Sequence, residues 1–404
     1  MKKIGIGIAA VFLVGALGYA GWFAYTNLRG SGPAFGPVPG NIVNYFNTPT
    51  AAVSPRAPVN NTEFPLTVPQ GFSIALYAKD LGSPRVLAWD PKGTLVVSIT
   101  QDGKVVALPD DNHDGISDRT VTILSGLRLP HGLAFRGNTL YVAETNEIAT
   151  YDYNPATLTA TNRKKIIDLP DKGFHFTRTI GFGPDGRLYT AIGSDCNVCV
   201  EKDARRAAIY ASNSDGTDFK PYATGLRNAV FFTWSSDRRM WATVMGRDYL
   251  GDNVPPDTVD IISGGKNYGW PYCYGKNVWD QTFDPSQKAK DFCATVEPSH
   301  IDMQAHSAPL GLAFVPKSWP QEYQNNLLVA MHGSWNRSAP TGYKIVRFKL
   351  DNKGNYLGVE DFISGWLTNG GALGRPVDLL SDQQGNLFVS DDKAGVIYKI
   401  SSAH

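Results

Sequence analysis

The chain has almost no net charge. Its 404 residues include 38 Lys and Arg and 37 Asp and Glu, which give a formal charge of +1, and no basic block follows the apolar N-terminal run. Proteins that bind nucleic acid or anionic lipid by electrostatics need a local excess of positive charge. The composition therefore argues against nucleic acid and anionic lipid as partners.

Cysteine is scarce, with four residues in the whole chain. Cys196 and Cys199 form C-x-x-C, but no His follows, as haem attachment requires, and neither a second C-x-x-C nor a thioredoxin-like βαβ pattern is present. Four cysteines in an exported chain can be oxidised. We expect a local Cys196–Cys199 disulfide and a Cys273–Cys293 disulfide across an irregular, charged segment. A redox-active Cys196–Cys199 pair is the alternative.

The N-terminus carries an uncharged run from Ile4 to Tyr25, preceded by two lysines. This length suffices for one helix to cross a bilayer, and the flanking charges predict an exported C-terminal part. A cleaved signal peptide is the alternative, although the run exceeds the usual apolar core and no A-x-A site follows. We predict a membrane anchor or signal peptide at 1–28, a flexible Gly- and Pro-rich linker at 29–66, and one domain at 67–404. The protein is then periplasmic and anchored to the inner membrane, or secreted if cleaved.

Helical periodicity is almost absent after residue 66, and a repeated phrase takes its place. Each copy combines an apolar pair, a polar or glycine turn and an apolar strand, with further strands following. Six copies, each with three or four short strands, predict an all-β, six-bladed β-propeller. The strand near Phe72 is expected to close the last blade and so remove an open edge. The copies begin at Val86, His131, Thr179, Asn228, Leu310 and Val377.

Propeller geometry converts these positions into a site, because the loops that lead into each innermost strand meet at one mouth of the channel. His175 precedes the third copy and Asp195 follows its second strand, so the two should lie at the same end of a hairpin. A His beside a carboxylate suits a general base, whereas a surface His and a turn Asp is the plainer interpretation. The other converging segments are Pro130–His131, Arg227–Asn228, Gly246–Asp248, His306–Pro309, His332–Arg337 and Gly374–Pro376.

The converging side chains suit a flat, anionic, oxygen-rich ligand. Arg227 and Arg375 occupy matching positions and offer planar bidentate donors for carboxylates and neighbouring carbonyls. Trp335 offers a stacking face. The alternative is that each arginine pairs with a nearby aspartate for structural reasons.

Several motifs resemble the glucose/sorbosone dehydrogenase family. They are GLRN at 225–228, SGGKNYGWP at 263–271, the sequence GRPVDLLSDQQGNLFVSDD from Gly374, and an isolated His ahead of the GFGPDGRLYTAIG hairpin. The CNVC and HGSWNR segments resemble its sorbosone dehydrogenase branch. The resemblance implies a six-bladed propeller that oxidises a sugar or sugar-derived aldehyde with pyrroloquinoline quinone (PQQ) and calcium. A downstream quinone or cytochrome would then accept the electrons.

The resemblance also implies residue roles. His175 matches the catalytic base and Asp195 its acidic partner, while Arg227, Asn228 and Arg375 match cofactor contacts. The backbone carbonyls of Asp252 and Asn253 fall where the family binds its active-site calcium. This chain departs from the family's glucose oxidisers, which have Gly-Pro at the calcium loop, a second arginine where Val377 stands, and a lysine within the segment matching His332–Arg337. These departures disfavour glucose as substrate and leave open a non-catalytic binding module. A calcium-dependent, lactonase-like hydrolase is the other alternative, although the converging loops offer arginines and histidines more than carboxylates.

One acidic loop offers a second metal hypothesis. Asp110, Asn112, Asp114 and Asp118 follow the first part of an EF-hand-type spacing, with Gly115 at the turn. Closely spaced carboxylates suit calcium, but the closing Glu is missing and strands flank the loop. A structural calcium site and a solvated turn both remain open on the sequence.

Overall fold

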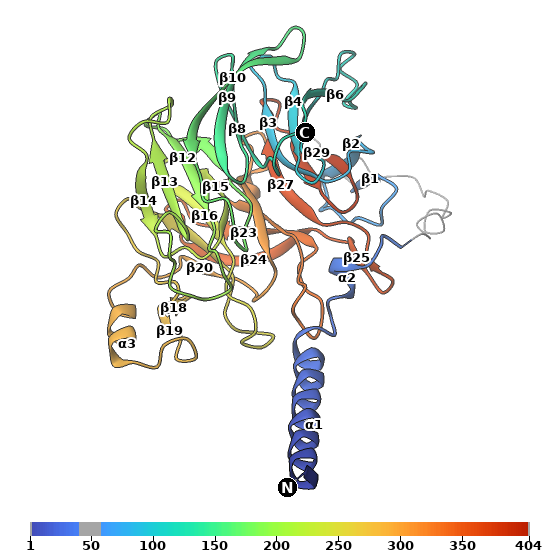
Figure 1. Ribbon diagram of the computed structural model, residues 1–404. Coiled ribbons are helices and arrows are strands. Elements are labelled where there is room, and N and C mark those ends of the chain that lie inside the picture. The colour runs from blue at the N-terminus through green and yellow to red at the C-terminus, as the bar shows by residue number, and fades with distance from the viewer. Residues whose placement is uncertain (1, 40–57, 403–404) are drawn as a thin grey trace.

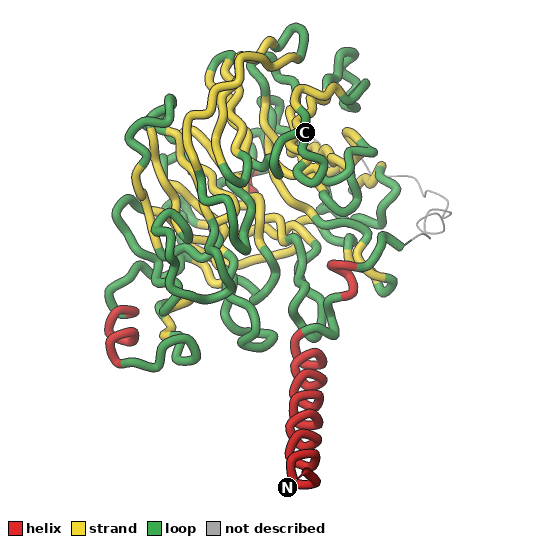
Figure 2. The backbone as a smooth tube through the Cα atoms, in the orientation of Figure 1, coloured by secondary structure: helices red, strands yellow, loops and turns green. Residues whose placement is uncertain are grey.

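The computed structural model describes residues 2–39 and 58–402. Strands account for most of the folded part of the chain, and the α-helices lie at its periphery (Figures 1 and 2). The helices are α1 (Lys2–Asn27), α2 (Gly32–Phe35) and α3 (Gln287–Cys293), with a short 3-10 helix at Gln321–Tyr323.

The described residues form six main sheets, each of four or five strands. The first three are β3 (Pro84–Trp89), β4 (Leu95–Ile99), β5 (Lys104–Leu108) and β6 (Val121–Leu124); β7 (Gly132–Arg136), β8 (Thr139–Ala143), β9 (Glu147–Asn154) and β10 (Thr159–Asp168); and β11 (Ile180–Phe182), β12 (Leu188–Ile192), β13 (Ala208–Ser212) and β14 (Lys220–Thr224).

The other three sheets follow the same order from inner to outer strand. They are β15 (Ala229–Trp234), β16 (Met240–Val244), β17 (Thr258–Ile262) and β20 (Ile301–Asp302); β21 (Pro309–Phe314), β22 (Leu327–Met331), β23 (Lys344–Leu350) and β24 (Tyr356–Ile363); and β27 (Pro376–Ser381), β28 (Leu387–Asp391), β29 (Val396–Ser402), β2 (Phe72–Ala78) and β1 (Val59–Asn61).

The six sheets close into a ring. Contacts link β3 to β7, β7 to β11, β12 to β15, β15 to β21, β21 to β27 and β27 back to β3. The predicted six-bladed propeller is therefore confirmed, and each sheet is one blade. In the second strands of five blades, apolar and polar residues do not alternate, because both faces of these strands are buried. Every residue is buried in β4, β12, β16, β22 and β28. A blade packs against a neighbour on both faces, so its central strand is apolar on both sides.

The last blade is closed by the N-terminal strand β2, as predicted. β2 pairs antiparallel with β29, with Phe72 opposite Ser402. β1 adds a fifth strand parallel to β2. Joining the two ends of the domain in one sheet leaves the ring without a gap between its first and last blades.

The segment predicted as a flexible linker is partly ordered, which corrects the boundary at residue 67. The Asn60 side chain donates to the carbonyls of Phe64 and Leu66, and both of those side chains are buried in the core of blades 5 and 6. Nearer the N-terminus, α2 packs against the β25 (Leu367–Thr368) and β26 (Gly371–Ala372) hairpin. Residues 40–57 of the predicted linker lie outside the described residues.

The predicted anchor at 1–28 forms the helix α1, which extends from one side of the propeller (Figure 1). Among the described residues, no helix combines the length and the apolar character that a membrane span requires. The anchor is not confirmed.

Blade 4 carries a long insertion between β17 and β20. It contains α3 and the short hairpin of β18 (Cys273–Tyr274) and β19 (Val278–Trp279), which lie at the edge of the molecule in Figure 1. The Cys273–Cys293 disulfide links the hairpin to the end of α3, and Cys196–Cys199 closes a loop in blade 3. Both predicted disulfides are confirmed.

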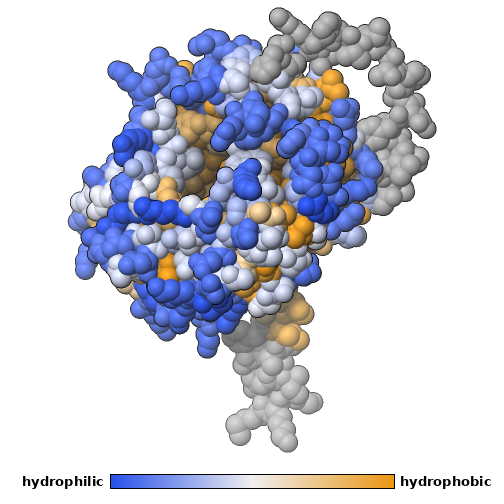
Figure 3. Space-filling model, turned by 90° about the horizontal axis from the view of Figure 1, so that it is seen from above, coloured by the Kyte–Doolittle hydropathy of each residue, from blue (hydrophilic) through white to orange (hydrophobic). Residues whose placement is uncertain are grey.

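The face of the molecule seen in Figure 3 is mostly polar. Figure 3 shows hydrophilic residues over most of one face and around its rim, with apolar residues visible in a hollow near the middle. This agrees with the nearly balanced charge of the chain and with apolar packing between blades.

Candidate active site

Loops of blades 3, 4 and 5 line a cavity of about 200 Å³. These loops are of two kinds. One kind leads into the innermost strand of a blade, and the other connects the second strand of a blade to the third. Both kinds were expected at one mouth of the channel, and the structure brings them together. The lining residues are Phe174, His175, Arg227, Met245, Gly246, Asp248, Asp257, His306, Ala308, Trp335 and Asn336.

His175 stands before β11, and its ring is held from one side by Ser194, at the end of the β12 hairpin strand. The Nδ1 atom lies 2.9 Å from the Ser194 carbonyl oxygen and 3.0 Å from its Oγ. A carbonyl only accepts, so Nδ1 carries the proton and Nε2 keeps its lone pair. Among the described residues Nε2 has no hydrogen-bond partner. This is the tautomer that a proton-accepting imidazole requires.

Asp195 is not the partner of this imidazole, contrary to the sequence-based prediction. Its residue is exposed, and a Cβ added at Gly173 would lie 2.3 Å from its carboxylate and 2.8 Å from the Arg206 guanidinium, which places both groups at that glycine. The residue before it, Ser194, takes the position beside His175. A strand alternates its side chains, so neighbouring residues at its end point to different places.

Burial is the largest cause that lowers the pKa of His175, to about 3, and the charge of Arg227 adds to it. The imidazole is therefore neutral near pH 7. Arg178 and Arg206 act in the same direction.

Arg227 is a buried cation whose donors are all used within the protein. Its Nε donates to the Asn197 carbonyl at 2.9 Å, and Nη1 donates to the carbonyls of Gly246 at 2.7 Å and Met245 at 3.5 Å. Its Nη2 donates to Asn197 Oδ1 at 2.9 Å and to Asp248 Oδ2 at 3.1 Å. These five bonds engage all five N–H groups of the guanidinium. Arg227 lines the cavity as predicted, but it has no free fork with which to grip a ligand.

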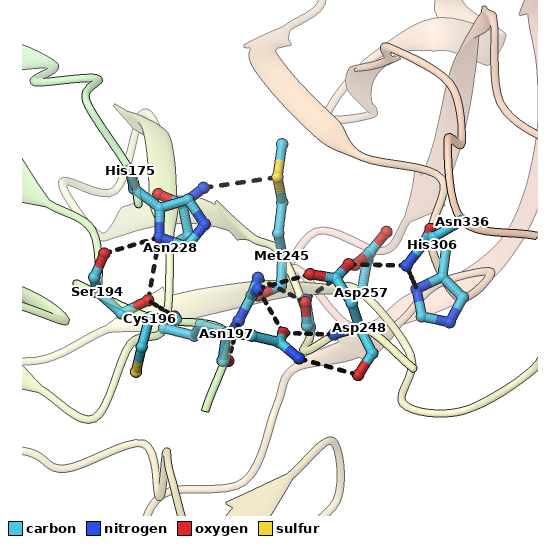
Figure 4. A network of polar contacts seen from close by, with 12 residues as sticks. His175, Ser194, Cys196, Asn197, Asn228, Met245, Asp248, Asp257, His306 and Asn336 are labelled. Carbon is cyan, nitrogen blue, oxygen red and sulfur yellow. Dashed lines mark hydrogen bonds and ion pairs between the residues drawn. The ribbon is translucent and has the colours of Figure 1, made fainter. Parts of the chain in front are cut away.

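Asn228 lies next to His175. A Cβ added at Gly193 would lie 2.4 Å from Asn228 Oδ1 and 2.7 Å from His175 Cβ, so the glycine lets both side chains pack on the backbone of β12. The Asn228 amide lies 3.6 Å from the Met245 sulfur, a weak contact. Figure 4 shows His175, Asn228 and Met245 grouped on one side of the site.

Two buried carboxylates form the opposite side of the cavity (Figure 4). Asp248 accepts from Asn336 at 2.7 Å as well as from Arg227, and Asp257 accepts from the Gly246 and Ala308 amides and the Ser307 hydroxyl. Burial raises the pKa of both. The carboxylates hold three loops in register around the cavity, and Asp248 neutralises Arg227.

Trp335 lines the cavity, whereas Arg375 does not. Arg375 donates to the carbonyls of His332 at 3.0 Å and Gly333 at 2.7 Å. It therefore fixes the backbone of the loop that carries Trp335. Its Nη1 donates to none of the residues that the structure describes.

The predicted calcium loop is occupied by a guanidinium of the chain itself. Arg337 Nη1 donates to the Asp252 carbonyl and, at 3.1 Å, to the Ala305 carbonyl, while Nη2 donates to Asn253 Oδ1 at 3.3 Å. Ser338 caps the Asp252 carboxylate through its amide and hydroxyl. The Asp252 carbonyl and carboxylate and the Asn253 side-chain oxygen thus already accept from Arg337 and Ser338, and a guanidinium at this loop does not fit a metal ion beside it.

The acidic loop after β5 matches a solvated turn better than a metal site. Asp110 accepts from the amides of Asp114 and Gly115, Asn112 also accepts from the Asp114 amide, and Asp118 accepts from the Asp111 amide. Within residues 2–39 and 58–402 only Cys196, Cys199 and Glu201 bring three potential metal ligands together, and the two sulfurs there form a disulfide.

Sequence reasoning missed Ser194 and Asp257. Ser194 acts beside His175 through its backbone carbonyl, which no residue type reveals. Asp257 lies nine residues beyond the Gly246–Asp248 segment. It directly precedes β17, the third strand of blade 4, and this position in the loop between the second and third strands was the available signal.

The fold and the site define a six-bladed propeller with a histidine-containing cavity at the channel mouth. The TrAA12-like family model matches residues 66–403, so the chain belongs to this family. The resemblance to PQQ-dependent propeller dehydrogenases is confirmed, and the sorbosone branch is not.

Two relatives and one solved structure illustrate the similarity. An uncharacterized protein of Borreliella burgdorferi is 30% identical over 83% of this chain and 90% of its own length. A "pyrroloquinoline quinone-dependent pyranose dehydrogenase" of Coprinopsis cinerea is 28% identical over 86% of this chain, which spans 56% of that relative. The holo PQQ domain of a C. cinerea pyranose dehydrogenase superposes with a TM-score of 0.74 at 23% identity, over 85% of this chain and 100% of that one.

Proposed function

We propose that this protein is an oxidoreductase that oxidises a sugar, with PQQ as the hydride acceptor and His175 as the general base. The observation that carries the proposal is that His175 lines the cavity with Nδ1 bonded to Ser194, which leaves the Nε2 lone pair without a partner among the described residues. The similarity to PQQ-dependent sugar dehydrogenases supports the class of reaction.

The cavity residues fit a flat, oxygen-rich ring. Trp335 gives an aromatic wall, Asn228 gives an amide next to His175, and Arg227 gives a fixed positive charge. A paired arginine grip on carboxylates is not part of this proposal, because Arg227 has no free donor and Arg375 does not line this cavity. When bound, PQQ supplies a two-electron acceptor.

The chain's own residues handle the proton and the developing charge. His175 Nε2 accepts the proton from the substrate hydroxyl while Ser194 keeps the ring in one orientation. Arg227 stabilises negative charge in the cavity without reorganising, because its hydrogen bonds already fix it. Trp335 limits the access of water from the side of blade 5.

The substrate class proposed is an aldose or related pyranose, with a sugar-derived aldehyde as the alternative, and a quinone or cytochrome as the later electron acceptor. Calcium at this loop is not part of the proposal, because the Asp252 carbonyl and carboxylate already accept from Arg337 and Ser338. Location outside the cytoplasm is also a proposal, supported by the two disulfides, since disulfides persist in oxidising compartments. Cell fractionation with a cytoplasmic marker tests it.

The test is a calorimetric titration of PQQ into the purified protein, followed by addition of aldoses while the absorbance of the bound quinone is recorded. We expect saturable binding and a sugar-dependent bleaching. Arg227→Lys should weaken the affinity by roughly 1.5–3 kcal/mol, because lysine cannot keep the five bonds that hold the charge in place. Arg136→Lys, at an exposed turn, is the matched control and should bind like the parent.

Absence of PQQ binding would end the dehydrogenase proposal and favour a binding module. A lactonase-like hydrolase is disfavoured, since the two carboxylates of the cavity, Asp248 and Asp257, already accept hydrogen bonds from neighbouring residues of the chain. Quinone binding without bleaching by any aldose would retain the cofactor and move the substrate class to aldehydes.

A further inference from the structure

The ring closed by the Cys196–Cys199 disulfide lies between His175 and Arg227. It contains four residues, and its two Cα atoms are 6.2 Å apart. Figure 4 shows Cys196 and Asn197 between the histidine on one side and Asp248 on the other. The ring therefore contacts both functional parts of the cavity.

On the side of blade 3, the ring supports the histidine through Ser194. The Ser194 hydroxyl donates to the Cys196 carbonyl at 2.8 Å. The same hydroxyl lies 3.0 Å from His175 Nδ1, and the Ser194 carbonyl accepts from that atom. Fixing the Cys196 carbonyl thus fixes the group that orients the imidazole.

On the side of blade 4, the ring holds the cation through Asn197. The Asn197 carbonyl and Oδ1 both accept from Arg227, each at 2.9 Å. Oδ1 also accepts from the Asp248 amide at 2.7 Å, and Nδ2 donates to the Asp248 carbonyl at 3.2 Å. One asparagine therefore makes four hydrogen bonds across the gap between two blades.

These four bonds need the backbone and the side chain of Asn197 in one conformation at once. Ordering a loop residue costs about 1–2 kcal/mol of backbone entropy, and a covalent ring removes part of that cost because fewer conformations are available. The ring adds little to the packing of the fold: no hydrophobic cluster of the described residues includes residues 196–199, and Asp195 and Val200 on its flanks are exposed.

We propose that Asn197 is a positioning residue, held in place by the Cys196–Cys199 disulfide, that fixes the buried cation Arg227 relative to the proton acceptor His175. The chemical consequence rests on the proposed function of this site. That Asn197 holds Arg227 in place is a structural statement and does not depend on the proposed function.

The test uses four variants of the full chain. Asn197→Ala removes three of the four bonds, and Cys196→Ser with Cys199→Ser opens the ring. Val198→Ala trims a side chain of the same ring without touching Arg227, and Cys273→Ser with Cys293→Ser removes the other disulfide. The last two are the matched controls.

The first measurement is proton exchange at the Nη2–H groups of Arg227, which donate to Asn197 Oδ1 and Asp248, by ¹⁵N NMR of the quinone-free protein, assigned by their loss in Arg227→Lys. We expect exchange about tenfold faster or more in Asn197→Ala and in the opened ring, and parent-like exchange in both controls. The second is PQQ affinity, expected to fall about 10–100-fold in the same two variants. Asn197→Asp keeps the oxygen that accepts from Arg227 but adds a negative charge, so it is compared by exchange at Arg227, which should stay close to that of the parent.

Parent-like exchange at Arg227 in Asn197→Ala would overturn the proposal, as would equally fast exchange in Asn197→Ala and Asn197→Asp. If opening the ring prevents folding, Asn197→Ala still decides whether Asn197 holds Arg227, since this variant keeps the disulfide. Failure of the parent to bind PQQ would remove the proposed function, whereas the exchange measurement would still test whether Asn197 holds Arg227.

Discussion

His175 and Arg227 lie in one cavity and are held in different ways. The histidine is fixed at one nitrogen by Ser194 and leaves the other free, while the arginine is fixed at every N–H and acts only through its charge. A group that exchanges protons needs one unpaired atom, and a group that supplies a field needs rigidity.

Replacing His175 by Ala should lower turnover by about 10²–10⁴-fold, the usual effect of a positioned general base, and leave the fold intact. Steady-state kinetics with PQQ and sugar, alongside thermal melting, measure both. The exposed His113→Ala variant is the control. Near-normal turnover in His175→Ala would move the role to another residue, with His131 and His332 the next candidates.

His175 also makes stability depend on pH in a defined direction. Its pKa in the folded protein is about 3 and the ordinary value is about 6.5, so between these values the unfolded chain binds a proton that the folded protein does not. Its contribution is therefore present above about pH 6.5 and is lost as the pH falls toward 3. In denaturant titrations, the free energy of unfolding of His175→Gln minus that of the parent should be larger at pH 4.5 than at pH 7.5. The reason is that only the parent loses the contribution of His175 as the pH falls. An unchanged difference at the two pH values would contradict the lowered pKa.

The Asp252 side chain should not contribute to calcium binding. Its carboxylate already accepts from Ser338, and its carbonyl already accepts from Arg337. Calorimetric titration of calcium into the parent and into Asp252→Asn should give the same result. A weaker calcium affinity in the variant would show that the Asp252 carboxylate binds calcium.

At the scale of elements, the strand β2 carries the closure of the propeller. Phe72 at its start is 1% exposed, and its ring lies 4.7 Å from that of Trp319 and 5.0 Å from that of Tyr323, measured between centroids. A strand from the N-terminus thus packs against side chains of blade 5 while it pairs with blade 6. This arrangement couples the first and last parts of the domain.

Phe72→Ala should lower the free energy of unfolding by about 3–5 kcal/mol, as for other buried phenylalanines, because the cavity opens in the closing blade. Guanidinium titration measures the loss. Phe35, 73% exposed on α2, provides the control, and Phe35→Ala should change stability by no more than about 0.5 kcal/mol. A loss below 1 kcal/mol in Phe72→Ala would mean that closure does not depend on this side chain.

For the whole molecule, ring closure means that binding at the mouth stabilises all six blades together. PQQ at about 100 times its dissociation constant should add about 2.7 kcal/mol to the free energy of unfolding and raise the single melting transition by several degrees. Differential scanning calorimetry with and without PQQ measures it, with the sugar alone as control. A transition that splits, or that does not move at saturating PQQ, would contradict a common fold around one site.

Local signals in the sequence were sufficient for the architecture. Apart from the last blade, which β2 closes from the N-terminus, each blade is a run of consecutive strands, so its pattern is local, as in the hairpin where Gly186 at φ 80° turns β11 into β12. The disulfide pairs and the meeting of the inner loops follow from the same local order. The cavity residues His175, Arg227 and Trp335 were predicted because a propeller converts loop position into spatial position.

The partners of these residues were decided only by the tertiary structure. Ser194 contacts His175 through a backbone carbonyl, and such an acceptor is the same for every residue type. Arg337 reaches the carbonyl of Asp252, 85 positions earlier in the chain, and so fills a loop that the sequence assigned to calcium. A guanidinium binds whichever acceptors the fold places within about 3 Å, and no spacing in the chain fixes that distance across two blades.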